Sequence, residues 1–187
     1  MSDNFYLNRR SVLARKMQNH PIKDVDLQAI ISAGIRVPDH GALNPWKIKV
    51  IQNEKLKAID ENIILSEFKR ENPEASNESL AIESKRLQRA SVVLAVLSTP
   101  VDHPKIPKWE MVLSSGAVCM NLLSCAQSLG YAAQWLTEWY AYNNKMLEYL
   151  EGRQGIDQIS GFIYIGHKIE EPNERRRPDP QKVISYL

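Results

Sequence analysis

"SVVLAVLST", residues 91–99, is an unbroken run of aliphatic residues closed by a serine and a threonine. Strands that are buried on both faces are continuously apolar, whereas strands with one wet face alternate apolar and polar residues. The run therefore predicts a central strand that is covered on both sides. Three further strand-like segments are expected to join it in a sheet, at residues 46–52, 131–136 and 159–166.

Helical segments separate these strands, with apolar residues recurring at helical spacing. The expected helices are a short one from Asp3 to Asn8 with Ser2 as its N-cap, and longer ones at residues 23–37, 54–70, 74–89, 108–129 and 143–150. Strands and helices mix without the regularity of βαβ units, so the predicted class is α+β. A single domain over residues 1–187 fits the length of the chain.

The segment from Met111 to Thr137 contains no charged residue. Ser, Asn and Gln side chains interrupt it and Gly130 breaks it, whereas a membrane span needs about 20 predominantly apolar residues. We expect a helix surrounded by protein, followed by a strand. Such a helix is either the centre of a core or the seam of a dimer, and the sequence leaves both open.

The composition is that of an ordinary globular protein, with 43% hydrophobic residues, 25% charged residues and a net charge of +2. This balance predicts no nucleic-acid partner and no membrane partner. The N-terminus carries no apolar signal core, which favours a cytoplasmic location. In that reducing compartment, Cys119 and Cys125 are expected to be small buried apolar residues.

Motifs of metal, hydrolase or nucleotide chemistry are missing from the sequence. The two cysteines lack zinc-ligand spacing, and His20, His103 and His167 have no mutual spacing typical of a metal site. These histidines are expected to be structural or exposed. The glycines form neither a dinucleotide-binding pattern nor a P-loop. The sequence therefore predicts no metal site and no hydrolase.

The connector "RVPDHGALNPW", residues 36–46, contains charged and aromatic side chains that a turn does not require. Turn formers would suffice for a link this short, but Arg36, His40 and a final Trp46 are added. Near the N-terminus, "NRRS" at residues 8–11 sets two guanidinium groups beside a hydroxyl, a combination that suits a phosphate. Each feature alone is more typical of a solvated surface or a structural turn.

Six segments together resemble the nitroreductase family of FMN-dependent oxidoreductases. In chain order they are "NRRS", "RVPDHGALNPW", "KIPKWE", "LGYAAQWLTEW", "GFIYIG" and "RRRPDP". The resemblance implies a three-layer α/β/α fold, in which a central, mainly antiparallel mixed sheet is flanked by helices. It also implies a homodimer with tightly bound FMN at its interface and a C-terminal arm exchanged between the subunits.

The resemblance assigns one group of FMN-binding residues to each end of the cofactor. Arg9, Arg10 and Ser11 match the residues near the phosphate and ribityl end. Arg175 and Arg177 stand where many relatives carry a further phosphate-binding arginine.

The flavin ring is expected to contact both subunits. The main chain of the segment Trp135, Leu136 and Thr137 would run along the ring and bring an amide near N5. The residues implied to come from the other subunit are Arg36, Pro38, Asp39 and His40, with Arg36 and His40 contacting FMN and the other two shaping the turn. Trp46 is expected to pack in the core.

The activity implied is hydride transfer from NAD(P)H to flavin N5 and then to a nitroaromatic, a quinone or a related small acceptor, by a ping-pong scheme. Because the flavin performs the chemistry, no side chain is expected to be catalytic. Two alternatives stay open: a flavin-binding sensor or carrier with little turnover, and another flavin reaction on the same fold, such as dehalogenation or flavin degradation.

Two positions depart from the family pattern. Many relatives place a basic residue near flavin N1, two positions after the serine, where this chain has Leu13. A positive charge there would stabilise the reduced flavin. Ala42 replaces the asparagine or serine that other branches carry before the Pro-Trp pair, which removes one polar contact.

Overall fold

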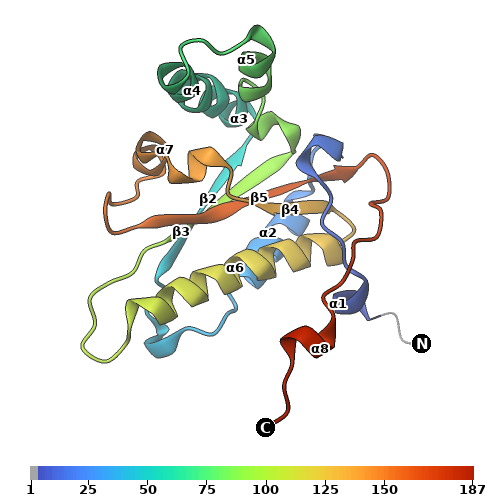
Figure 1. Cartoon of the computed structure of the whole chain (residues 1–187), viewed down its shortest axis with the longest axis vertical. Helices are drawn as coiled ribbons and strands as arrows, with labels where there is room; N and C mark the ends of the chain where they lie inside the picture. The colour runs from blue at the N-terminus through green and yellow to red at the C-terminus, as the bar shows by residue number, and fades with distance from the viewer. Residues whose placement is uncertain (1–3) are drawn as a thin grey trace.

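A five-stranded sheet with helices on both faces forms the body of the protein in the computed structural model, which describes residues 4–187 (Figure 1). The strands are β1 (Met17–Gln18), β2 (Trp46–Gln52), β3 (Val92–Ser98), β4 (Ala132–Leu136) and β5 (Gln158–Lys168). β5 pairs with β1, β3 and β4, and β3 pairs with β2. All these pairings are antiparallel, so the parallel pair of a mixed sheet is absent from the described strands.

β3 is the central strand that the run at residues 91–99 predicted, and all of its residues are buried. Successive side chains of a strand point to opposite faces. Val93, Ala95 and Leu97 accordingly join one hydrophobic core, while the alternate set of Val92, Leu94 and Val96 joins the other. Because β3 is apolar on both faces, its side chains contribute to both hydrophobic cores.

The two cores lie under separate layers of helices, which confirms the three-layer arrangement (Figure 1). One layer consists of α2 (Asp24–Gly34) and α6 (Lys108–Ser128). The other consists of α3 (Glu54–Ile59), α4 (Ser66–Glu71), α5 (Asn77–Glu83) and α7 (Asn144–Tyr149). The helix expected at residues 54–70 also contains a π-helical segment, η3 (Asp60–Leu65), between α3 and α4.

The helix expected at residues 74–89 is interrupted, because it ends as α5 and resumes as the single turn η4 (Leu87–Arg89). Asp60, which is fully buried, accepts hydrogen bonds from the main-chain N–H groups of Leu87 at 2.8 Å and Gln88 at 3.1 Å. Burial raises the pKa of Asp60, and these hydrogen bonds oppose that rise. A tertiary contact from η3 thus replaces continuation of the helix.

α6 packs on α2 and on the sheet through one side, where Met111, Val118 and Leu122 are buried. It is long and apolar enough to cross a membrane by composition, and these contacts account for that composition. Trp109 and Leu113 on its N-terminal half are 67% and 54% exposed. The helix therefore lines the core of this chain and also carries an uncovered apolar face.

The segment after α1 and the C-terminal arm lie side by side (Figure 1), where Arg10 bonds the carbonyl of Asn173. α1 (Phe5–Asn8) begins after Asn4, whose side chain accepts a hydrogen bond from the N–H of Tyr6; the proposed cap Ser2 lies outside the described residues, as does Asp3. η1 (Ala14–Lys16) follows it. The C-terminal arm, residues 170–187, is largely exposed and contains α8 (Pro180–Val183).

The cysteine prediction holds for one residue of the two. Cys119 is buried in the core under α6, and burial raises the pKa of its thiol to about 12. Cys125 is only half-buried because its helix turns it toward the edge of α2, where its Sγ lies 3.9 Å from the carbonyl oxygen of Ala29. Both thiols are free.

Candidate functional site

A pocket of about 1020 Å³ lies between the segment that follows α1 and the C-terminal arm. Its wall is strongly basic. The basic side chains are Arg9, Arg10, Lys16, Arg175, Arg176, Arg177 and Lys182, and the acidic ones are Glu170, Glu174 and Asp179. An excess of guanidinium groups suits a multiply charged anion such as a phosphate, because each group can donate two parallel hydrogen bonds.

The two adjacent arginines at the base of this pocket differ in what they bind. Arg10 donates from Nε and Nη2 to the carbonyl oxygen of Asn173, both at 3.2 Å, and so ties the C-terminal arm to the N-terminal segment. Arg9 has a buried Nη1 that finds no hydrogen-bond acceptor among the residues described. A buried, unpaired cationic donor is costly, so Arg9 is the residue whose geometry calls for an anionic ligand.

The segment that carries these arginines is fixed by main-chain contacts. The N–H of Val12 donates to the carbonyl of Ala133 at 3.2 Å, and that of Ala14 donates to Oε1 of Gln134 at 2.6 Å. From α6, Gln127 Nε2 donates to the carbonyl of Arg10 at 2.9 Å. Gln127 and Gln134 were not among the predicted site residues, and their signal in the sequence is a polar amide within an otherwise uncharged stretch.

β4 leads from this pocket along a free edge of the sheet. It pairs only with β5 among the described strands, and the carbonyl of Ala133 faces Val12 on the other side. Main-chain groups alternate in direction along a strand, so those of Trp135 face the same free edge. Of the predicted segment, Trp135 thus presents main-chain groups at this edge, whereas none of Trp135, Leu136 and Thr137 lines the pocket, which β4 reaches through Gln134.

The indole of Trp135 is held flat against β5. Its Nε1 donates to the carbonyl of Ser160 at 3.0 Å. Gly161, next along β5, has φ 153, and a Cβ there would lie 2.1 Å from Trp135 Nε1. Only glycine leaves room for this contact, which lies where β5 shifts register against β3.

The connector at residues 36–46 runs along α6 from Asn121, whose Nδ2 donates to the carbonyl of Arg36 at 2.8 Å, toward the N-terminus of the helix. Ser114 Oγ donates to the carbonyl of Pro38 at 2.8 Å and accepts from Trp46 Nε1 at 3.2 Å, so Trp46 anchors the strand as predicted. His40 Nδ1 pairs with Glu110 Oε2 at 2.7 Å. The tight turn is closed by Asp39, whose carboxylate accepts the N–H of Asn44 at 2.7 Å.

The predicted residues therefore form two groups along α6. The pocket group is Arg9, Arg10, Ser11, Arg175 and Arg177, with Gln127 of α6 holding its backbone. The connector group is Arg36, Pro38, Asp39 and His40, and its contacts with α6 run from Asn121, which bonds the carbonyl of Arg36, to Glu110, which pairs with His40. At 1.5 Å per residue, Gln127 is separated from Glu110 by about 25 Å and from Asn121 by about 9 Å. One chain therefore keeps His40 far from the pocket group, whereas Arg36 starts nearer to it.

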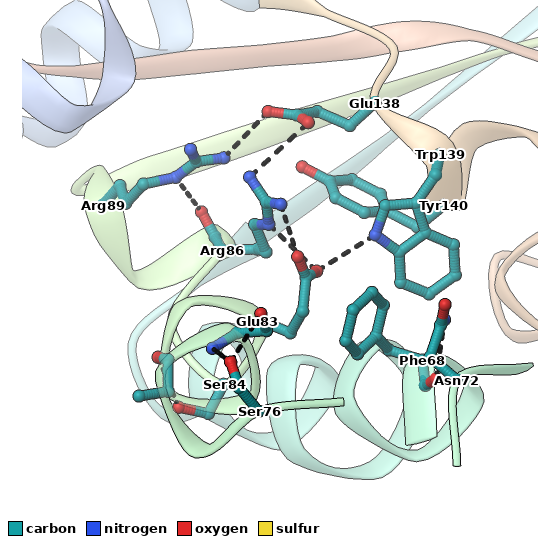
Figure 2. Close-up of polar contacts among 12 residues, drawn as sticks. Phe68, Asn72, Ser76, Glu83, Ser84, Arg86, Arg89, Glu138, Trp139 and Tyr140 are labelled. Carbon is teal, nitrogen blue, oxygen red and sulfur yellow. Dashed lines mark hydrogen bonds and ion pairs between the residues drawn. The ribbon is translucent and has the colours of Figure 1, made fainter. Parts of the chain in front are cut away.

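A network of charged side chains that the sequence did not suggest lies just beyond β4. Glu83, Arg86, Arg89 and Glu138 come from three separate segments and meet beside Trp139 and Tyr140 (Figure 2). Behind it, the hydroxyls of Tyr140 and Tyr164 are hydrogen-bonded, and burial raises the pKa of Tyr164 to about 12. Elsewhere in residues 4–187, three or more His, Cys, Asp or Glu side chains nowhere gather as a metal site would require.

The comparisons with known proteins all match the same family. The model of the nitroreductase family matches residues 6–167. A relative from Escherichia coli K12, named "Putative NAD(P)H nitroreductase YdjA", is 28% identical over 191 residues, covering 97% of this chain and 96% of that protein.

Solved structures share the fold. A nitroreductase-like family protein from Bacillus cereus matches with a TM-score of 0.78 at 20% identity, over 98% of this chain and 94% of that one. A nitroreductase with bound FMN from Bacteroides fragilis matches with a TM-score of 0.70 at 20% identity, over 98% and 96% of the two chains. With the family match over most of its length, this chain belongs to the nitroreductase family.

Proposed function

We propose that this protein is an FMN-dependent oxidoreductase that uses NAD(P)H to reduce a small acceptor such as a nitroaromatic or a quinone. The observation that carries the proposal is the buried, unpaired Nη1 of Arg9 at the base of a basic pocket. The relative named as an NAD(P)H nitroreductase and the FMN-bound structure of the same fold support the choice of donor and cofactor.

The pocket group fits the phosphate end of FMN. Arg9 supplies an unpaired donor, Ser11 supplies a hydroxyl, and the arm supplies Arg175 and Arg177. Arg10 donates two hydrogen bonds to the carbonyl of Asn173 in the arm. It therefore orders the pocket and also adds positive charge to it. The free edge of β4 then offers the main chain of residues 135–137 to the ring.

A second copy of the chain completes the site. His40 is held near the N-terminus of α6, at the far end of the helix from the contact with the pocket segment of its own chain. Trp109 and Leu113, exposed beside the connector, provide an apolar face for a homodimer seam. In the dimer, Arg36 and His40 of one chain face the ring bound by the other, and the C-terminal arm crosses to its partner.

Bound FMN would supply the redox chemistry, taking hydride from NAD(P)H and giving the electrons to the acceptor. The chain's own residues bind the phosphate, orient the ring through main-chain groups and cover it. Leu13 lies in the pocket wall where a cation would favour the reduced state. Lys16 does not replace that cation, because its ammonium is paired with Glu170 and holds the pKa of that carboxyl below its usual range.

If donor and acceptor use the same face of one flavin ring, they must bind in turn. Initial-rate plots against NAD(P)H at several acceptor concentrations should be parallel, as for any ping-pong scheme.

We assign the protein to the cytoplasm, where NAD(P)H is available and free thiols stay reduced.

The direct test is the spectrum of the purified protein, followed by NAD(P)H oxidation with and without an added quinone or nitroaromatic. A yellow protein with sustained acceptor-dependent oxidation is expected. A protein that binds FMN but oxidises NAD(P)H only once would be a flavin carrier instead. Failure of the apoprotein to bind added FMN would contradict the whole assignment.

A further inference from the structure

Glu138, the residue directly after the segment expected along the flavin ring, has an unusual backbone. Its φ is 55 and its ψ is 172, at the edge of a region that glycine alone occupies freely. A non-glycine residue persists there only where its surroundings enforce the conformation, and such residues gather at functional sites. The side chain of Glu138 shows what enforces it.

The carboxylate of Glu138 is held by two arginines (Figure 2). Oε1 accepts from Arg89 Nη2 at 3.3 Å, and Oε2 lies 3.6 Å from Arg86 Nη1. All three side chains are less than one quarter exposed. Ion pairs shielded in this way are screened little by salt, so the side chain is fastened at its far end while its backbone turns.

The two arginines cannot easily follow Glu138, because each is fixed by other contacts. Arg86 Nε donates to Glu83 Oε2 at 3.0 Å, and the Trp139 indole donates to the same oxygen at 3.0 Å. Arg89 Nε donates to the carbonyl of Arg86 at 2.7 Å, and its guanidinium lies 5.4 Å from the centre of the Tyr164 ring. The two arginines that hold the Glu138 carboxylate are therefore kept in place by contacts that do not involve Glu138.

We propose that Glu138 is a positioning residue for FMN, whose anchored carboxylate forces the backbone after Thr137 into a strained turn and so fixes the main-chain groups offered at the end of β4. The carboxylate itself points into the network with Arg86 and Arg89, so it takes no part as an acid or base. This inference rests on the proposed function, since it concerns the ring end of the same site.

The test compares Glu138→Ala with Glu138→Gly, measuring the FMN dissociation constant and the FMN midpoint potential. Alanine removes the anchor and keeps a Cβ, so the backbone relaxes and FMN binds about tenfold more weakly, the scale of the strain involved. Glycine also removes the anchor but occupies the turn freely, so most of the affinity and the native potential should return. Arg89→Met, which loosens the anchor from its other end, should weaken binding in the same direction.

Asn53 provides the matched control, because it also has φ 55 and precedes a helix, but carries no ion pair in the described structure. Asn53→Ala and Asn53→Gly should change the stability of the apoprotein and leave FMN affinity unaltered. Equal affinities for Glu138→Ala and Glu138→Gly would overturn the inference, and so would an Arg89→Met protein that binds FMN normally if Glu138→Ala does not fold. Wild-type protein that binds no FMN would instead refute the proposed function.

Discussion

Arg9 and Arg10 are adjacent in the sequence and chemically identical, yet their surroundings give them different tasks. Arg10 already has an acceptor in the carbonyl of Asn173, whereas Nη1 of Arg9 is buried without one among the residues described. Nδ1 of His40 is likewise already engaged, by Glu110 Oε2 at 2.7 Å. At this scale, function is decided by which donors the fold leaves unpaired.

Arg9→Ala should weaken FMN binding at least about tenfold, because a charge-assisted hydrogen bond contributes about 1.5–3 kcal/mol. Removing an unpaired buried cation should at the same time leave the apoprotein as stable as before, or more stable. Titration of apoprotein with FMN, followed by flavin fluorescence, measures the first effect, and urea unfolding measures the second.

Arg70→Ala on α4 is the control for Arg9, since Arg70 is exposed and pairs only with Glu67 and Glu71. It should not change FMN affinity. If Arg9→Ala also retained native affinity, Arg9 would be a structural residue and the phosphate site would have to be sought elsewhere in the pocket.

α6 is the element on which the protein is organised. One side of it fills the core with Met111, Val118 and Leu122, and its two ends hold the connector and the N-terminal segment. Its remaining side presents Trp109 and Leu113 to solvent. The absence of charge along this helix after Glu110 is therefore consistent with both functions that the sequence left open, a core on one side and a proposed seam on the other.

Leu113→Lys should convert the proposed dimer to monomer and release FMN, because a charge would be buried in the proposed seam. Sedimentation at micromolar concentration, recorded together with the flavin absorbance, measures both losses. Ile82→Lys on α5 is a matched control, since Ile82 is 53% exposed and Leu113 is 54% exposed. A folded Leu113→Lys dimer with full FMN would show that α6 does not form the seam.

The turn between α7 and β5 predicts a dependence of stability on pH. Burial alone would raise the pKa of Asp157, but hydrogen bonds from the side chain and the N–H of Arg153 outweigh burial and lower it. A carboxyl whose pKa is lower in the folded state stabilises the protein above its unfolded pKa, and the stabilisation is lost as the pH falls through the folded value.

Asp157→Asn should therefore cost about 1–3 kcal/mol of unfolding free energy at pH 7, with the difference from wild type shrinking below pH 3.8. Urea unfolding at a series of pH values measures it. Asp102→Asn is the control, because the pKa of Asp102 is also lowered, by Lys108, but its side chain is 95% exposed and such pairs contribute little. A difference that did not vary with pH would rule out this ion pair as its source.

At the scale of the whole molecule, the candidate site is divided between surfaces that one chain keeps apart. The contacts of α6 with His40 and with the pocket segment lie about 25 Å apart along the helix. Symmetric pairing of two identical chains is the common way to bring such surfaces together, because a two-fold interface uses the same patch twice. The exposed C-terminal arm, which ends in apolar residues with Tyr186 97% exposed, is expected to pack on the partner.

Mixing Arg9→Ala protein with His40→Ala protein tests this division. Each variant alone has two damaged sites, but a mixed dimer has both lesions in one site and none in the other. About half of the sites in mixed dimers should then recover FMN binding and turnover. Verified subunit exchange without recovery would mean that each chain builds its own site.

From the sequence alone, the main strands, the long helix and the family could be predicted. Continuous apolar residues at 91–99 marked a strand with two covered faces, the segment from Trp46 to Gln52 formed β2 with the predicted bounds, and the uncharged stretch formed α6. Six ordered motifs identified the family. These features depend on neighbours in the chain, on periodicity and on local turn chemistry, so they can be predicted from the order of residues alone.

Only the tertiary structure decided which polar groups are satisfied. The interruption before η4 depends on Asp60, and the support of the pocket depends on Gln127 and Gln134. The turn at Glu138 depends on arginines about 50 residues earlier in the chain. Hydrogen bonds and ion pairs form between groups that folding brings together, and they stabilise the protein most where water is excluded. Neither the partner of a group nor its exclusion from water can be predicted from the residues next to it in the chain.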